Sequence, residues 1–317
     1  MKRIIATLTV IMLISSVTSC GSNCPKKLKG SPTLITRSIA IDDYHSLTAS
    51  QDIEVQLTST QHHELFIEMD EKLSDQLKVE NHDGHLYLEI PPKRNNLKRA
   101  HIHVKAPLPK DVRKLEAHLS ARITSLEALQ TDNIECNATT TSRIEVAVRC
   151  KRASLNANTA SQIKAAIQAD DCTLEAAQGS TIKGDIRTQS CHAEAHTASQ
   201  IEAQIQTKDC FLTASSASKI EGDVQVEETC DVKASLSSKI ELEGSTKVLN
   251  VDVRLSSKAD LEGLTAQRGK VVCESASKAE MQSLKGFEFT SSTGSKITCL
   301  NKVAPATSCE ESNESTN

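Results

Sequence analysis

Large aromatic side chains are nearly absent from this chain of 317 residues. It has no tryptophan, and aromatic residues make up only 2% of the sequence. A globular domain of this length normally fills its core with such rings, so we expect a thin interior packed with aliphatic side chains. The same shortage excludes an aromatic stacking platform for sugars or single-stranded nucleic acids.

A dominant charge is also missing from the chain. Lysine and arginine number 37 against 41 acidic residues, for a formal net charge of −4. Such a balance provides no field that would attract nucleic acid, so we predict no nucleic-acid partner.

An apolar run long enough to span a bilayer is missing as well, but a short one follows Lys2 and Arg3 near the N-terminus. Its length indicates a signal peptide over residues 1–20 rather than a membrane helix. The last four residues, Val17-Thr18-Ser19-Cys20, resemble a bacterial lipobox, in which the cysteine is lipidated. We therefore predict a lipid anchor on Cys20 and a tether over residues 21–36. The alternative is an ordinary secretory signal with a chance cysteine.

What the chain does contain is a repeated three-residue word that begins with serine. Successive copies start 18 to 20 residues apart, a period typical of a solenoid. The copies are Ser142-Arg143-Ile144, Ser161-Gln162-Ile163, Ser180-Thr181-Ile182, Ser199-Gln200-Ile201, Ser218-Lys219-Ile220, Ser238-Lys239-Ile240, Ser257-Lys258-Ala259, Ser277-Lys278-Ala279 and Ser295-Lys296-Ile297.

Apolar and polar residues alternate with period two on both sides of each serine, which indicates strands with one buried face. We predict an all-β fold: a right-handed parallel β-helix over residues 119–303, with about ten rungs of ~19 residues spaced ~4.8 Å apart. Residues 37–118 alternate without the repeat and form a β-rich N-terminal module, with a hairpin at Asp83-Gly84. Residues 304–317 form a disordered polar tail.

Several short motifs occur in a characteristic order along the chain. The lipobox is followed by Ile39-Ala40-Ile41-Asp42-Asp43-Tyr44, Asp52-Ile53-Glu54-Val55, Asp83-Gly84-His85-Leu86-Tyr87-Leu88, His101-Ile102-His103-Val104 and the serine words. In this order the chain resembles the putative auto-transporter adhesin, head GIN domain family of Bacteroidota envelope proteins, over residues 37 to 300. The resemblance implies an all-β, helix-like fold and an envelope location, and it supplies no catalytic residues.

Four cysteines occupy one inward column on successive rungs: Cys172, Cys191, Cys210 and Cys230. Stacked equivalents are close enough for disulfides, but their Cβ vectors run parallel rather than toward each other. Three states are open: buried free thiols that act as small hydrophobic side chains, two disulfides between adjacent rungs, or a metal site. We predict the structural, reduced column and no metal.

The residue after the serine is lysine on five successive rungs, and acidic residues follow two positions later. One interpretation is a neutralised, soluble β-surface that also discourages edge pairing. The other is an anion-binding stripe for acidic glycans or lipopolysaccharide, formed by Lys219, Lys239, Lys258, Lys278 and Lys296. His101 and His103 share one strand face and could begin a zinc site, but we favour a solvated strand face without a metal.

The motifs of nucleophilic, phosphate-binding and zinc enzymes are absent from the sequence, so we predict no enzyme and no cofactor. The predicted function is an adhesin-like module, held in the outer membrane by its lipid, that presents the long β-helix face to glycan, lipopolysaccharide or protein. The first alternative is a structural envelope spacer or signalling accessory without a ligand of its own. The second is a polysaccharide-active β-helix enzyme.

Overall fold

The computed structural model describes residues 33–60, 63–91, 101–282, 285–292, 294–299 and 302–303. The predicted signal peptide with Cys20, residues 21–32 of the predicted tether and the tail after residue 303 lie outside these residues. Strands account for 70% of the described residues, and one 3-10 turn, η1 (Glu71–Leu73), interrupts them. No helix among the described residues is long and apolar enough to span a bilayer.

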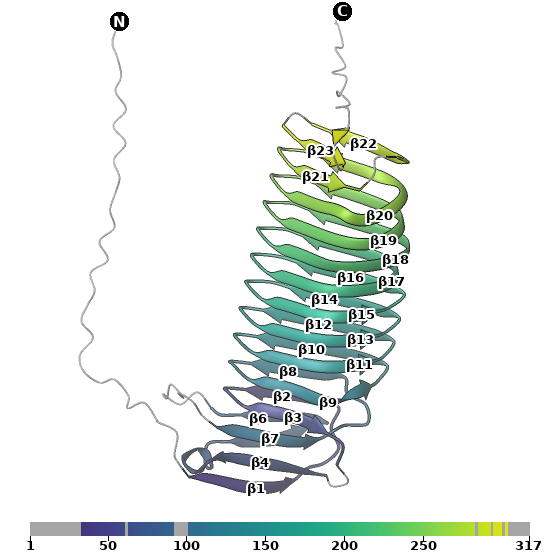
Figure 1. Cartoon of the computed structure of the whole chain (residues 1–317). Helices are drawn as coiled ribbons and strands as arrows, with labels where there is room; N and C mark the ends of the chain where they lie inside the picture. Colours follow the sequence, from purple (N-terminus) through teal and green to yellow (C-terminus); the bar gives the residue numbers. More distant parts are fainter. Residues whose placement is uncertain are drawn as a thin grey trace, which may run out of the picture.

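The strands form a solenoid of about ten turns with a spacing of about 19 residues, which confirms the predicted β-helix (Figure 1). Each coil contributes one strand to a first face and one to a second face. The first face contains β2 (Ser46–Ser50), β6 (His85–Glu89), β8 (Lys114–His118), β10 (Asn133–Thr139), β12 (Arg152–Asn158), β14 (Asp171–Ala176), β16 (Ser190–Ala195) and β22 (Phe287–Ser291). The second face contains β3 (Glu54–Thr58), β7 (Ile102–Pro107), β9 (Arg122–Gln130), β11 (Arg143–Arg149), β13 (Gln162–Gln168), β15 (Thr181–Arg187), β21 (Lys278–Met281) and β23 (Lys296–Cys299).

Four long strands near the C-terminal end run through both faces without a break. Each begins on the second face, bends, and ends on the first face, with register shifts between neighbouring strands. They are β17 (Gln200–Ala214), β18 (Lys219–Ala234), β19 (Lys239–Val253) and β20 (Lys258–Cys273).

The N-terminal strands belong to the same stack, but not in chain order. On the first face β2 lies between β6 and β8, and on the second face β3 lies between β7 and β9. The chain thus completes one coil, leaves it, and places β6 and β7 beneath it before it returns. β1 (Leu34–Ala40) pairs antiparallel with β4 (Glu64–Asp70), which pairs antiparallel with β7. β1 therefore begins inside the segment expected to be a tether.

Short antiparallel pairs occur at both ends of the stack. β5 (Lys78–His82) and β6 form the predicted hairpin, with Asp83 and Gly84 both at positive φ. At the other end, β24 (Lys302–Val303) pairs antiparallel with β23.

The interior follows the predicted alternation. The isoleucines of the serine words lie in register on adjacent coils, and those from Ile144 to Ile240 are at most 2% exposed. Glu202, the residue after Ile201, lies on the outside. Because the inward residues of the first face are mostly cysteine, leucine and alanine, the two faces pack closely without aromatic rings.

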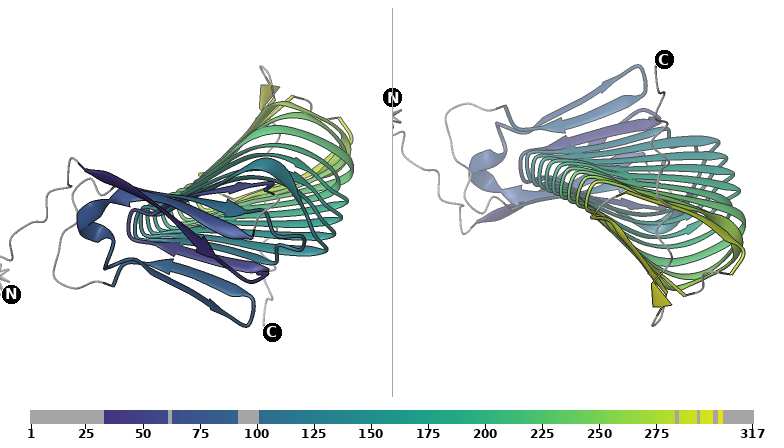
Figure 2. Two further views of the ribbon diagram at one scale, coloured as in Figure 1. Left: turned by 90° about the horizontal axis from the view of Figure 1, so that it is seen from below. Right: turned by 90° about the horizontal axis from the view of Figure 1, so that it is seen from above.

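Each coil turns from the first face to the second at one sharp corner, toward which the coils converge in the end-on views (Figure 2). The corner consists of two successive residues at positive φ, for example Ser216 and Ala217. The buried serine follows, and its hydroxyl stabilises the turn: Ser218 Oγ donates to the carbonyl of Ala195 (2.6 Å) and accepts from the Ser215 N–H (2.9 Å). The repeated serine is therefore a structural residue.

Candidate functional site

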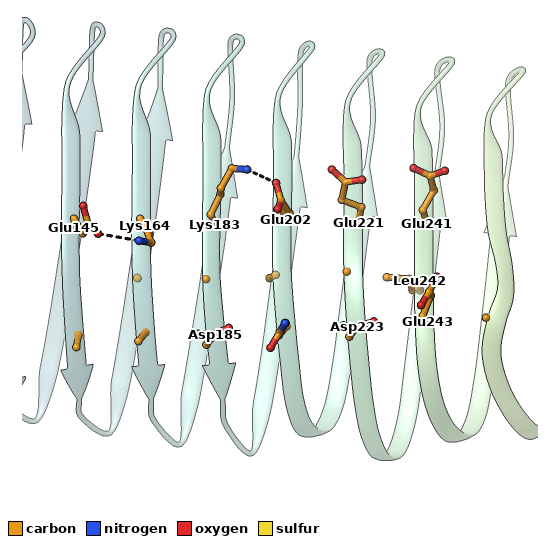
Figure 3. A pocket seen from close by; sticks show the side chains of 18 of the residues that line it. Glu145, Lys164, Lys183, Asp185, Glu202, Glu221, Asp223, Glu241, Leu242 and Glu243 are labelled. Carbon is orange, nitrogen blue, oxygen red and sulfur yellow. Dashed lines mark hydrogen bonds and ion pairs between the residues drawn. The ribbon is translucent and has the colours of Figure 1, made fainter.

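A groove of about 1160 Å³ runs across the coils on the outer side of the second face (Figure 3). The third and fifth residues after each serine form its two walls, and the fourth residue forms its floor. The floor is small or apolar: Val146, Ala165, Gly184, Ala203, Gly222 and Leu242. Because equivalent positions stack, one groove extends over seven successive coils, roughly 30 Å at ~4.8 Å per coil.

Glycines at the floor allow the main chains of adjacent coils to approach closely. A Cβ on Gly222, which has φ +153, would lie 1.8 Å from the carbonyl oxygen of Ala203. A Cβ on Gly184 would lie 2.4 Å from the carbonyl oxygen of Ala165. The floor of the groove is therefore main chain with little side chain above it.

The two walls differ in how their charges are balanced. In the third-residue wall, Lys164 pairs with Glu145 at 3.0 Å and Lys183 pairs with Glu202. The fifth-residue wall carries acids without an ion pair to any described residue: Asp185, Asp223, Glu243 and Glu262. Negative charge therefore accumulates toward the C-terminal half of the groove.

The predicted lysine stripe lies between the sharp corner and this groove. Lys219, Lys239, Lys258, Lys278 and Lys296 pair in register on successive coils. The first four of these lysines form ion pairs with acids that occupy the third position after the serine. Lys219 pairs with Glu221 and Glu241, and Lys239 pairs with Glu241. Lys258 pairs with Asp260 and Glu280, and Lys278 pairs with Glu280.

We name these alternating ion pairs between lysines and acids the outer ladder. Its hydrogen bonds shift the pKa values of both the acids and the lysines. Those from Lys219 and Lys239 lower the pKa of Glu241, and those from Lys258 and Lys278 lower the pKa of Glu280. In turn, hydrogen bonds to Glu221 and Glu241 raise the pKa of Lys219. The lysine stripe is thus continuous. Acids that stand two residues farther along each strand from the corner balance most of its positive charge.

The four cysteines of the predicted column are in register, buried, and present as free thiols. Hydrogen bonds with Cys191 and Cys230, together with burial, raise the pKa of Cys210 well above its usual value. Burial likewise raises the pKa of Cys172. Protonated thiols in a closed interior act as small apolar side chains.

Histidines near the N-terminus contact carboxylates. The Nε2 atom of His101 lies 2.8 Å from Glu68, and that of His103 lies 3.2 Å from Glu54. Among the residues the structure describes, no three histidine, cysteine or acidic side chains meet in a way that could hold a metal ion.

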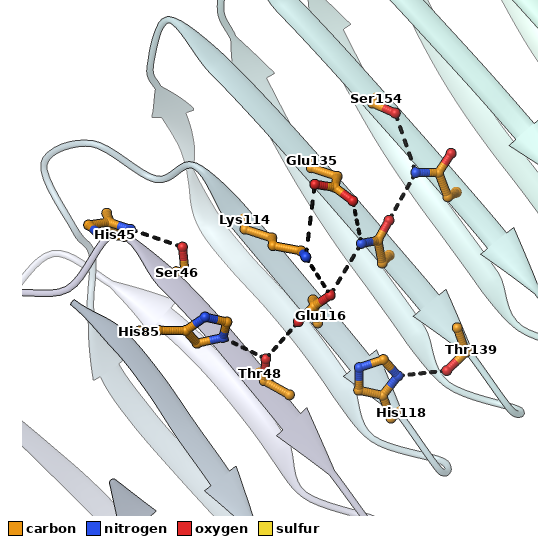
Figure 4. A network of polar contacts seen from close by, with 12 residues as sticks. His45, Ser46, Thr48, His85, Lys114, Glu116, His118, Glu135, Thr139 and Ser154 are labelled. Atoms are coloured by element: carbon orange, nitrogen blue, oxygen red, sulfur yellow. Dashed lines mark hydrogen bonds and ion pairs between the residues drawn. The ribbon is translucent and has the colours of Figure 1, made fainter. Parts of the chain in front are cut away.

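A polar network crosses the first face where the out-of-order strands join the stack (Figure 4). Thr48 Oγ1 on β2 donates to Glu116 on β8 (3.0 Å), so it must accept the hydrogen bond from His85 on β6 (2.7 Å). Burial alone would raise the pKa of Glu116, but hydrogen bonds from Lys114, Thr48 and Asn137 outweigh it and lower that pKa. A hydroxyl that donates to a carboxylate and accepts from histidine is not an activated nucleophile, so this network holds strands together.

The family follows from two stretches of the chain. Residues 43–208 and residues 190–302 each match the model of a family described as putative auto-transporter adhesin, head GIN domain. The chain belongs to this family. The second match covers only coils of the solenoid, so the head GIN domain pattern extends into the repeats. The resemblance indicated by the motifs is thereby confirmed.

Solved structures share the fold of this head GIN domain protein. A protein of Parabacteroides distasonis described as a putative lipid binding protein has 16% sequence identity and a TM-score of 0.53, over 87% of this chain and 100% of its own. A putative adhesin of the same species has 14% identity and a TM-score of 0.51, over 86% of this chain and 100% of its own. No curated protein matches the chain.

The groove was not predicted from the sequence. The third-residue acids were recognised as partners of the lysines, but the fifth-residue acids were not singled out. The available signal was Gly184 and Gly222, which stand where other coils carry alanine, valine or leucine. A glycine at an otherwise apolar strand position often marks close approach of another backbone.

Proposed function

We propose that this protein is a non-enzymatic binding module of the cell envelope, and that its groove holds an extended polymer along the solenoid. The observation that carries the proposal is the groove itself, which repeats one wall–floor–wall pattern over successive coils. A linear ligand can meet the same set of groups at every coil, so weak contacts add along its length.

The chemistry of the walls favours a ligand rich in hydroxyl or ammonium groups. Carboxylates accept hydrogen bonds, and the acids of the fifth-residue wall, such as Asp223 and Glu243, are not occupied by a basic partner among the described residues. An anionic chain would meet repulsion in the C-terminal half. Hydroxyl-rich glycans and lysine-rich protein segments both fit.

The relatives support binding rather than turnover. The family is described as adhesin-like, and one structural neighbour as lipid binding. A β-helix enzyme needs a group of acids and bases that departs from the repeat, whereas the groove carries the same positions on each coil. The structural spacer remains the alternative, and the polymer-binding experiment distinguishes it.

Anchoring through a lipid on Cys20 in the outer membrane is part of the proposal. The lipobox Val17-Thr18-Ser19-Cys20 supports it. Cys20→Ala should release the protein from membranes washed with high salt, because salt weakens electrostatic contacts with lipid headgroups but does not remove an acyl anchor. Retention of this variant on salt-washed membranes contradicts the anchor but leaves groove binding untouched.

The test of the groove is binding to a glycan array and to fluorescent polylysine. Asp223→Lys/Glu243→Lys should weaken binding at least about tenfold, because it replaces acceptors with repelling charges. The matched control, Asp171→Lys/Glu175→Lys, reverses two exposed acids on β14 of the first face and should bind like the wild type. Equal loss in both variants, or no binding to any probe, overturns the proposal in favour of the spacer.

A further inference from the structure

The sharp corners of the solenoid form a straight edge that carries no charge. Nine successive corners contribute two residues each, stacked at ~4.8 Å over roughly 40 Å. The pairs are Leu119-Ser120, Thr140-Thr141, Thr159-Ala160, Gln178-Gly179, Thr197-Ala198, Ser216-Ala217, Leu236-Ser237, Leu255-Ser256 and Ser275-Ala276. We name these residues the corner edge; charge returns only at the next corner below it, with Asp52.

Neither composition nor backbone preference explains this choice of residues. Charged residues make up 25% of the chain, and they are abundant on both faces beside the edge. Residues at positive φ are normally glycine, asparagine or aspartate, because other side chains crowd the backbone there. Only Gly179 follows that preference along the corner edge. The edge therefore carries threonine, serine, alanine and leucine at positions where glycine or asparagine would relieve backbone strain without adding charge.

Three leucines stand out on this edge. Leu236 and Leu255 occupy adjacent corners and are 50% and 48% exposed, and Leu119, six coils nearer the N-terminal end, is 46% exposed. Equivalent corners carry threonine, serine or glutamine. The exposed half of each leucine side chain makes no contact within the solenoid, so it is available for an external contact.

Basic residues flank the corner edge on the second face. The row next to it contains no acid: Arg122, Arg143, Gln162, Thr181, Gln200, Lys219, Lys239, Lys258 and Lys278. The row on the first-face side has one acid, Glu274, beside Arg254, His118 and His196. The acids that pair with the lysines lie two residues farther from the corner edge. Apart from Glu274, the charges nearest to the edge are therefore positive.

We propose that the corner edge docks on an anionic lipid surface, with the leucines in the acyl boundary and the flanking lysines and arginines at the phosphates. A narrow, straight, uncharged ridge fits a plane, and its apolar tips with basic flanks match the layers of a membrane interface. A protein partner would need one pocket for Leu236 and Leu255 and a second for Leu119, six coils away on the same line. The groove begins two residues beyond the lysine row, so the proposal does not depend on the proposed polymer binding.

The first test measures sedimentation of the full chain with vesicles. Cys20→Ala is included throughout, so that no acyl anchor contributes. We expect binding to phosphatidylglycerol vesicles, weaker binding to phosphatidylcholine vesicles, and at least about a tenfold loss in Leu236→Ser/Leu255→Ser. Ser216 and Ser275 already occupy this corner position, so the fold tolerates the change. The control, Leu126→Ser, alters a leucine that is 68% exposed on β9 and away from the edge, and should have no effect.

The second test separates charge from insertion. Lys239→Gln/Lys258→Gln should weaken binding to phosphatidylglycerol and leave phosphatidylcholine binding unchanged, since glutamine occupies the same row at Gln162 and Gln200. Lys164→Gln/Lys183→Gln, which removes two lysines from the groove wall, is the control. Full vesicle binding by the leucine variant, or none by the wild type, overturns the proposal. Self-association that the leucine variant abolishes without any vesicle binding also overturns it and makes the edge an interface between copies.

Polymer binding in the groove should be unchanged in Leu236→Ser/Leu255→Ser. Loss of vesicle binding and loss of polymer binding are therefore distinguishable results.

Discussion

The interior of the solenoid and its charged second face are built from alternate residues of the same strands, yet they obey different rules. Inside, one residue type repeats: isoleucine follows isoleucine from Ile144 to Ile240, and cysteine follows cysteine from Cys172 to Cys230. Outside, the lysine row from Lys219 to Lys278 stands beside a row of acids that balances it. Apolar side chains gain from stacking on their equivalents, whereas like charges at ~4.8 Å repel.

This difference explains why the repeat is strict inside and variable outside. An inward residue has a neighbour above and below and little free volume. An outward lysine such as Lys239 needs only a carboxylate within reach, and Glu241 supplies one. Ligand chemistry can therefore vary on the outer rows while the interior keeps the fold.

The strongest test of this contrast uses neighbouring residues of one strand. Ile201→Asp places a charge between two buried isoleucines and should lower the free energy of unfolding by several kcal/mol, on the order of 3–5. Glu202→Lys, one residue later, loses an exposed ion pair with Lys183 and should lower it by no more than about 1 kcal/mol. Chemical denaturation of both variants gives the comparison. Equal losses contradict the inside–outside register.

Thiol reactivity sharpens the same contrast. The buried thiols of Cys172, Cys191, Cys210 and Cys230 should react with iodoacetamide roughly a thousandfold more slowly in the native protein than after unfolding, because reaction requires opening. Among the cysteines that the structure describes, half-buried Cys150 and Cys299 should react first. Mass spectrometry of the labelled protein follows both groups. A Cys172–Cys191 or Cys210–Cys230 disulfide in protein isolated from cells would show instead that the column is oxidised.

How much of this structure the sequence could predict depends on repetition. The serine words fixed the period, so strands, inward columns and parallel register followed from alternation alone. The insertion of β6 and β7 beneath β2 and β3 did not, because residues 37–118 lack the repeat and strand order there depends on tertiary contacts such as Thr48 with Glu116. The groove was missed because its depth comes from main-chain approach at Gly184 and Gly222, which periodicity does not encode.

Substitution of a corner serine shows whether its buried hydroxyl stabilises the fold. Ser218→Ala removes a donor to the Ala195 carbonyl and an acceptor for the Ser215 N–H, and should lower the free energy of unfolding by about 1–3 kcal/mol. Ser216→Ala, two residues earlier on the corner edge, should change it by less than about 0.5 kcal/mol. A larger loss for Ser216→Ala would mean that the stabilising hydroxyl has been misassigned.

Backbone strain at the corners predicts changes of opposite sign. Gly179→Ala introduces a Cβ at φ +72 into open space, so strain alone should lower the free energy of unfolding by about 1 kcal/mol. Ala198→Gly, at φ +59 in the next corner, relieves strain and should raise the free energy of unfolding by up to about 1 kcal/mol. The greater conformational entropy of glycine in the unfolded chain reduces this gain. Thermal unfolding of the pair measures both. Changes of the same sign refute strain as the dominant effect.

The outer ladder should give the smallest effect, and acid reveals it. The pKa values of Glu241 and Glu280 are lowered in the folded protein from an ordinary value of 4.5, because they accept hydrogen bonds from lysines on both sides. A lowered folded pKa contributes stability that is present above pH 4.5 and disappears as the pH falls through the folded pKa.

The free energy of unfolding should therefore fall as the pH drops below about 4.5, and by less in Glu241→Gln/Glu280→Gln than in the wild type. Since the lysine partners are 34–42% exposed, each pair contributes less than about 1 kcal/mol, and added salt should reduce the difference. The control is Glu175→Gln, which removes an exposed carboxylate of the first face and should leave the pH dependence unchanged. If the double variant and the wild type lose stability in parallel, the ladder does not stabilise the fold, and its lysines are maintained for what they bind.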